Sequence, residues 1–192
     1  MRKSIKKMVT IRVAVALLAV LLFSVMMTIN ILSIQHSQEK NAEAAAVLDR
    51  VQRAEPAHYK WSANLSNALY ANSEFTGSTD PTSCVLGQWL YGEAGTYNAV
   101  ILQLRNEMEP LHKELHESAI LALEQYRTNP ATAQNYYQNT ILKNLSTLVG
   151  KLDSVVEESA AISAENAASM ERTITMMHFT SVIGLSLSLI AL

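Results

Sequence analysis

The sequence contains one cysteine and several histidines whose side chains are of the right types to bind a single metal ion. Cys84 is the only thiol in the chain. His112 and His116 are four residues apart, so on a helix both imidazoles project from one face, a turn apart. His58 supplies a third imidazole. Because a closed zinc site takes four nitrogen or sulfur donors in a tetrahedron, these side chains form a complete candidate ligand set.

Each donor alone also has an ordinary structural explanation. A His-x-x-x-His pair on a helix is more often solvated or packed than metal-bound, and a lone cysteine is more often an inert buried side chain. His58 falls in a core row of the predicted first helix, where an unpaired imidazole would lower stability. Cys84 follows the segment 80–83 (DPTS), which predicts a helix start. The thiol would then lie near a helix N-terminus, whose partial positive charge favours the thiolate.

Two other metal-dependent interpretations agree poorly with the sequence. A catalytic zinc keeps an open coordination position, and four protein donors leave none. The zinc-protease motif needs Glu directly after the first His, where this chain has Lys113. A haem held between His58 and His112 would leave the cysteine unexplained, and no Cys-x-x-Cys-His segment is present. We therefore expect no enzymatic activity and assign no catalytic residue.

Helices must position these donors. The middle of the chain is poor in Gly and Pro and shows no strand alternation, while apolar residues recur at spacings of three and four. The predicted helices run from the first apolar block to about residue 75, over 82–91, over 97–127, and from 131 into the last apolar block. The expected fold class is all-α, an antiparallel four-helix bundle with one short helix, between two transmembrane helices.

Two uncharged apolar blocks predict the membrane helices. Residues 13–35 are long enough to cross about 30 Å of hydrocarbon, and the basic residues within 1–12 place that end in the cytoplasm. A cleaved signal peptide is the alternative, but its apolar region usually spans only about 7–15 residues. Residues 173–192 predict a return crossing in an apparently truncated chain. Residues 36–172 would then lie on the extracytoplasmic, periplasmic side of the inner (cytoplasmic) membrane, in a multi-pass protein.

The charge and the cysteine content narrow the possible partners. The formal net charge is -2 and no basic stripe is present, so we expect no nucleic-acid partner. In an oxidising compartment a single thiol has no internal disulfide partner. Cys84 is then a metal ligand, a redox-reactive group or a buried side chain.

Three segments of the chain together resemble the chemoreceptor zinc-binding (CZB) domain. They are residues 58–61 (HYKW), 84–89 (CVLGQW) and 112–116 (HKELH), separated by equal gaps at 62–83 and 90–111. The resemblance implies that the zinc ligands are His58, Cys84, His112 and His116. It also implies that Trp61, Leu86, Gly87 and Trp89 are the packing and turn residues around them.

The resemblance further implies a membrane-bound sensory receptor of the bacterial chemoreceptor type, similar to a methyl-accepting chemotaxis protein. Its zinc domain would signal zinc availability or oxidant exposure across the membrane. The implied partners are a zinc ion, the membrane through two spans, a second copy in a homodimer, and a cytoplasmic signalling module that this chain lacks. The alternative is that zinc is only a structural staple and the true ligand or partner binds elsewhere. Many members of the family carry the domain in the cytoplasm, so the resemblance does not fix which signal an extracytoplasmic domain would sense.

Overall fold

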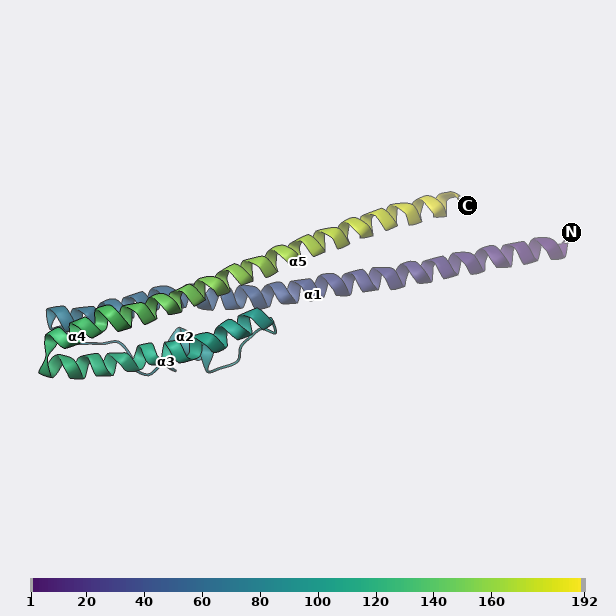
Figure 1. Cartoon of the computed structure of the whole chain (residues 1–192). Coiled ribbons are helices and arrows are strands. Elements are labelled where there is room, and N and C mark those ends of the chain that lie inside the picture. The colour runs from purple at the N-terminus through teal and green to yellow at the C-terminus, as the bar shows by residue number, and fades with distance from the viewer. Residues whose placement is uncertain (1, 191–192) are drawn as a thin grey trace. The chain divides into compact units, whose positions relative to one another are not determined.

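The computed structural model describes residues 2–190, and every regular element among them is a helix (Figure 1). The elements are α1 (Arg2–Ala71), α2 (Val85–Leu90), α3 (Ala99–Thr128), α4 (Pro130–Tyr136), the π-helix η1 (Tyr137–Ile141) and α5 (Leu142–Ile190). The described residues contain no strand. The predicted all-α class is therefore confirmed.

The ends of the helices differ from the prediction at identifiable places. α1 ends at Ala71 instead of near residue 75, because Asn72 adopts a positive φ of 53°, a conformation that terminates helices. The short helix starts at Val85, three residues later than predicted. The Asp80 carboxylate accepts hydrogen bonds from the backbone N–H and the hydroxyl of Thr82, so it closes a turn before α2 and does not cap the helix.

The predicted last helix is continuous in position but changes its type. It begins at Pro130, passes through the five-residue π-helix η1 and continues as α5. A π turn has i→i+5 hydrogen bonds and carries one extra residue relative to the α-helical register. Nothing in the local sequence pattern predicts this change.

The chain folds as two compact units. The central unit is Ala42–Ser163, and the other contains the described residues that precede and follow it. The core of the central unit includes apolar side chains from α1, α2, α3 and the last helical stretch. Its largest fully buried members include Leu65, Leu86, Trp89, Ile101, Met108, Leu115, Ile141, Leu148 and Leu152. The core row of α1 that contains His58 is buried as predicted, and so is a companion row beside it. The first row is Ala44, Val51, His58 and Leu65, and the second is Val47, Ala54, Trp61 and Ala68.

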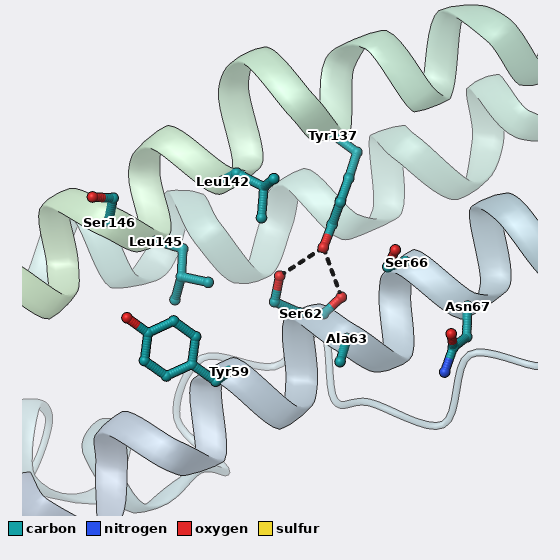
Figure 2. Close-up of a pocket in the computed structure, with 9 residues that line it drawn as sticks. All are labelled: Tyr59, Ser62, Ala63, Ser66, Asn67, Tyr137, Leu142, Leu145 and Ser146. Atoms are coloured by element: carbon teal, nitrogen blue, oxygen red, sulfur yellow. Dashed lines mark hydrogen bonds between the residues drawn. The ribbon is translucent and has the colours of Figure 1, made fainter.

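Polar side chains link neighbouring helices within the central unit. Between α3 and α5, Asn98 Nδ2 donates to Glu158 Oε1 at 3.0 Å and Asn144 Nδ2 donates to Glu114 Oε1 at 2.9 Å. Asn98 at the N-cap of α3 thus meets Glu158, whereas Glu114, farther along α3, meets Asn144 near the start of α5, so these two segments run in opposite directions. The Tyr137 hydroxyl at the start of η1 bonds the hydroxyl and the carbonyl of Ser62 in α1 at 2.9 and 3.1 Å (Figure 2).

The membrane candidate is a helix that begins in the unit formed by the two ends of the chain and continues into the central unit. By length and composition, one helix in the described part of the chain, Ile5–Ala71, is apolar enough to cross a membrane. Most of its large apolar side chains between Ile5 and Leu32 are exposed, Leu17 by 65%. The second predicted crossing continues α5, but residues 191–192 and several nearby side chains lie outside the described residues. Two crossings therefore stay a prediction.

Candidate metal centre

The four predicted donors lie together in the central unit. α1 supplies His58 and α3 supplies His112 and His116, while Cys84 directly precedes α2. One potential ligand atom from each side chain lies within 4.8 Å of the corresponding atom of every other. The convergence expected from the sequence is thus present. Their assignment as zinc ligands stays a prediction at this point.

The three imidazoles are buried and in mutual contact. His58, His112 and His116 are at most 2% exposed, and the ring centroids of the two α3 histidines are 4.6 Å apart. Burial is the largest cause that lowers the pKa of each ring, and burial together with the neighbouring His116 and His58 rings lowers the pKa of His112 to about 3. The imidazoles are therefore neutral near pH 7, which is the form that binds metals.

Backbone carbonyls fix the orientation of two of the rings. His58 Nδ1 lies 2.7 Å from the Ala54 carbonyl oxygen, and His116 Nδ1 lies 2.9 Å from the Ser78 carbonyl oxygen. A carbonyl oxygen only accepts, so Nδ1 carries the proton in both rings and Nε2 keeps a free lone pair. Metal-binding histidines almost always donate their second ring N–H to such an acceptor.

Two ring nitrogens in the cluster have no protein partner. His116 Nε2 and His112 Nδ1 are buried and make no hydrogen bond in the described part of the chain. A buried polar atom without a partner costs about 1–3 kcal/mol, so native proteins rarely leave one unexplained. A metal ion at the centre of the cluster would satisfy the His116 Nε2 lone pair. The residues present therefore match the requirements of a bound cation.

The sulfur of Cys84 lies beside two of the rings. Sγ is 3.1 Å from His112 Nε2 and 3.8 Å from His58 Nε2, and it accepts a hydrogen bond from the Gly87 N–H at 3.2 Å. Burial raises the pKa of the Cys84 thiol, although backbone N–H groups at the start of α2 act in the opposite direction. The start of α2 thus acts on the thiol pKa in the predicted direction, but desolvation outweighs it, so the net shift is upward. A coordinated metal ion removes the thiol proton outright.

Gly87 allows the turn before α2 to pack against the helix. A Cβ atom at this position would lie 1.8 Å from the Pro81 carbonyl oxygen, well inside any real contact distance. Only glycine lets the two backbone segments approach this closely. This close approach agrees with the packing and turn role that the resemblance implies for Gly87.

The two tryptophans contribute in different ways. The Trp61 ring centroid lies 5.2 Å from that of His116, and Trp61 Nε1 donates to the Ser78 carbonyl at 2.8 Å. That carbonyl therefore orients Trp61 and His116 at once. Trp89 is 1% exposed, and its Nε1 donates to the Ala94 carbonyl at 2.8 Å, which holds the turn after α2. Trp61 forms a wall of the cluster and Trp89 supports the short helix.

Sequence reasoning missed three groups around the cluster. The carbonyls of Ala54 and Ser78 orient histidines, and Arg105 of α3 donates hydrogen bonds to carbonyls at the end of α2. Every residue has a backbone carbonyl, so the sequence could not indicate that those of Ala54 and Ser78 orient the histidines. Arg105 precedes His112 by seven residues, which places it on the same helix face, and that spacing could have indicated it.

A separate cleft of about 430 Å³ lies on the central unit between α1 and the segment that includes η1 and the start of α5 (Figure 2). Its lining contains no ionised side chain and none of the four clustered donors. The residues that line it are Tyr59, Ser62, Ala63, Ser66, Asn67, Tyr137, Leu142, Leu145 and Ser146. Five of these nine carry a hydroxyl group, so the surface suits hydrogen bonding to an uncharged molecule.

The donor set limits the chemistry of the cluster. Three neutral imidazoles and one thiolate are nitrogen and sulfur ligands, the combination that zinc prefers in closed tetrahedral sites. If all four side chains bound one ion, no coordination position would remain for a reacting water, as in structural zinc sites.

One of three comparisons with known proteins gave a match. Neither a search of curated proteins nor a search of solved structures gave a match to the chain. A scan of family models matched residues 58–123, about a third of the chain. The matched segment begins at His58 and contains all four clustered donors. The family whose model it matches is the chemoreceptor zinc-binding domain.

Proposed function

We propose that the chain is the sensory part of a membrane-bound bacterial receptor of the chemoreceptor type. It binds one zinc ion through His58, Cys84, His112 and His116 and signals zinc availability or oxidant exposure across the membrane. The observation that carries this proposal is the convergence of all four donors within 4.8 Å, with a buried Nε2 of His116 that has no protein partner. The family match over residues 58–123 supports zinc as the ion.

The arrangement in the membrane follows the apolar segments. Residues 13–35 and 173–192 cross the bilayer, and residues 36–172 form an antiparallel four-helix bundle on the periplasmic side. The exposed apolar side chains between Ile5 and Leu32 support the first crossing, because a soluble protein rarely exposes a continuous apolar surface of that kind. In this proposal the chain acts as a homodimer and is not an enzyme.

The metal would join three separate pieces of backbone. His58 lies on α1, Cys84 lies at the start of α2, and the other two donors lie on α3. Loss of any one donor therefore loosens the contact between these segments. Because α1 also contains the predicted first membrane crossing, a change at His58 offers a route from the cluster toward the membrane.

Oxidation of Cys84 would act on the same contacts. The side chain is partly exposed, so a peroxide can reach it. The thiolate attacks one peroxide oxygen, the S–O bond forms as the O–O bond breaks, and hydroxide leaves, which gives the sulfenic acid. The product is a poorer ligand than the thiolate, so oxidant exposure and zinc loss converge on one structural change.

Metal analysis of the full-length chain in detergent micelles tests the site. We expect one equivalent of zinc in the wild type and loss of tight binding in His58→Ala and in Cys84→Ala. His36 lies outside the cluster, so His36→Ala serves as a matched control and should keep the metal. Unchanged zinc content in both cluster variants would contradict the proposal.

The cleft in Figure 2 favours a second candidate function, in which zinc is only a staple and a small uncharged ligand provides the signal. Chelation separates the two candidates. A sensor releases zinc to a chelator of moderate affinity and stays folded, whereas a staple contributes folding free energy outright. Unfolding that accompanies zinc removal, followed by circular dichroism, would favour the staple.

A further inference from the structure

The helix that carries Cys84 at its start is too short to hold its own orientation. α2 spans the six residues Val85–Leu90, and isolated helices shorter than about 12–15 residues are marginal in water. A thiolate must lie about 2.3 Å from a zinc ion to bind it. Contacts outside α2 must therefore fix the position of the Cys84 sulfur.

Arg105 of α3 holds the far end of this short helix. Its Nε and Nη2 atoms donate to the Trp89 carbonyl at 3.1 and 3.0 Å. Nη2 also lies 2.8 Å from the Leu90 carbonyl oxygen and 2.7 Å from the Gly92 carbonyl oxygen. The last carbonyls of a helix lack partners within the helix and carry partial negative charge, so a guanidinium is well matched to them.

Arg105 shares a helix face with two of the donors. It precedes His112 by seven residues and His116 by eleven, which corresponds to about two and three helical turns. Cys84 lies beside His112, and the carbonyls at the end of α2 lie beside Arg105. α2 therefore runs opposite to α3 and contacts it at both ends, through the cluster at one end and through the guanidinium at the other.

We propose that Arg105 is a positioning residue for the zinc ligand Cys84, an inference that rests on the proposed metal site. The guanidinium fixes the C-terminal end of α2 against α3 and thereby sets the distance between the sulfur and the imidazole of His112. The planar fork matters as well as the charge, because two of its nitrogen atoms bond three different carbonyls.

Cobalt(II) and zinc binding to the full-length chain in detergent micelles test this role. Removal of groups that orient metal ligands typically lowers affinity about 10- to 100-fold. We expect Arg105→Gln to lower zinc affinity by this amount and to weaken the thiolate-to-cobalt charge-transfer absorption. Arg105→Lys keeps the charge but not the fork, so it should recover part of both signals.

Tyr137→Phe is the matched control for general destabilisation. It removes the hydrogen bonds to Ser62 in the same central unit, but it leaves α2 and the four donors untouched. We expect it to lower the thermal midpoint without changing the cobalt spectrum or the zinc affinity. Wild-type affinity and spectrum in Arg105→Gln, or equal losses in Arg105→Gln and Tyr137→Phe, would overturn the positioning role.

Alkylation of Cys84 in metal-free protein separates this inference from the proposed function. We expect iodoacetamide to react several-fold faster with Arg105→Gln than with the wild type, because the released α2 exposes the partly buried thiol. If the wild type binds neither metal, the proposed zinc function fails, whereas the alkylation rates still measure the hold of Arg105 on α2. Equal rates in the two proteins would refute that hold.

Discussion

The close approach of Gly87 to Pro81 gives the sharpest test of how the cluster is built. In Gly87→Ala the new Cβ would lie 1.8 Å from the Pro81 carbonyl oxygen, whereas real Cβ contacts essentially never fall under 3.0 Å. The two backbone segments must therefore separate by more than about 1.2 Å, the difference between those values. Because the obstructing atom belongs to backbone, no side-chain rotation can relieve the clash.

That displacement is large compared with the tolerance of a metal site. Ligand distances in zinc sites hold within about 0.2 Å, and Cys84 lies between the two segments that must separate. We expect Gly87→Ala to lose tight zinc binding and to lower the free energy of unfolding by about 1–3 kcal/mol, as overpacking does. Zinc content after gel filtration and denaturant unfolding of the full-length chain measure the two effects.

Gly150 provides the control for this substitution. It lies within α5, and a Cβ there would meet nothing within 4 Å. Replacement of an unobstructed helical glycine by alanine stabilises a protein by about 0.5–1 kcal/mol, so Gly150→Ala should keep its zinc and become slightly more stable. Equal zinc content in the Gly87→Ala and Gly150→Ala variants would refute the steric reasoning.

Three further predictions concern other parts of the central unit. Tyr137→Phe removes both hydrogen bonds to Ser62 and should lower the free energy of unfolding by about 1–3 kcal/mol in a denaturant titration. Tyr97 is 91% exposed, so the control variant Tyr97→Phe should change that free energy little. Hydrogen bonds from Thr82 lower the pKa of Asp80, so this carboxylate stabilises the fold above the pKa that it has in the unfolded chain. The contribution is lost as pH falls through the lower pKa of the folded state. Denaturant unfolding curves of Asp80→Ala and the wild type should therefore differ at pH 6 and converge in strong acid. Peroxide should release zinc from the wild type, and a colorimetric chelator would detect the released metal. If the peroxide-treated wild type kept its zinc, a redox role for Cys84 would be contradicted.

The helices that carry the donors were largely predictable from local pattern. Apolar spacing along α1 placed His58 in a core row, and the structure buries it. The spacing of His112 and His116 put both rings on one face of α3. The start of α2 was predicted three residues early, because the Asp80 side chain bonds Thr82 and closes a turn instead of capping the helix.

The charge state of the cluster was less predictable. A cysteine at a helix start suggests a lowered thiol pKa, yet burial raises the pKa of Cys84. Burial depends on which segments pack over a side chain, and residues distant in sequence determine that packing. The same reasoning applies to η1, where the change to π geometry accompanies the contact of Tyr137 with Ser62 across the helices.

The sequence by itself determined the donor types, their spacing and the helices on which they lie, because side-chain chemistry and helical periodicity are local properties. Tertiary structure decided which ring nitrogens face the centre of the cluster, since the carbonyls of Ala54 and Ser78 set the orientation of His58 and His116. It also decided how α2 lies along α3, through the hydrogen bonds of Arg105 and the close approach at Gly87. Backbone acceptors are chemically the same at every residue, so only the folded geometry can select among them.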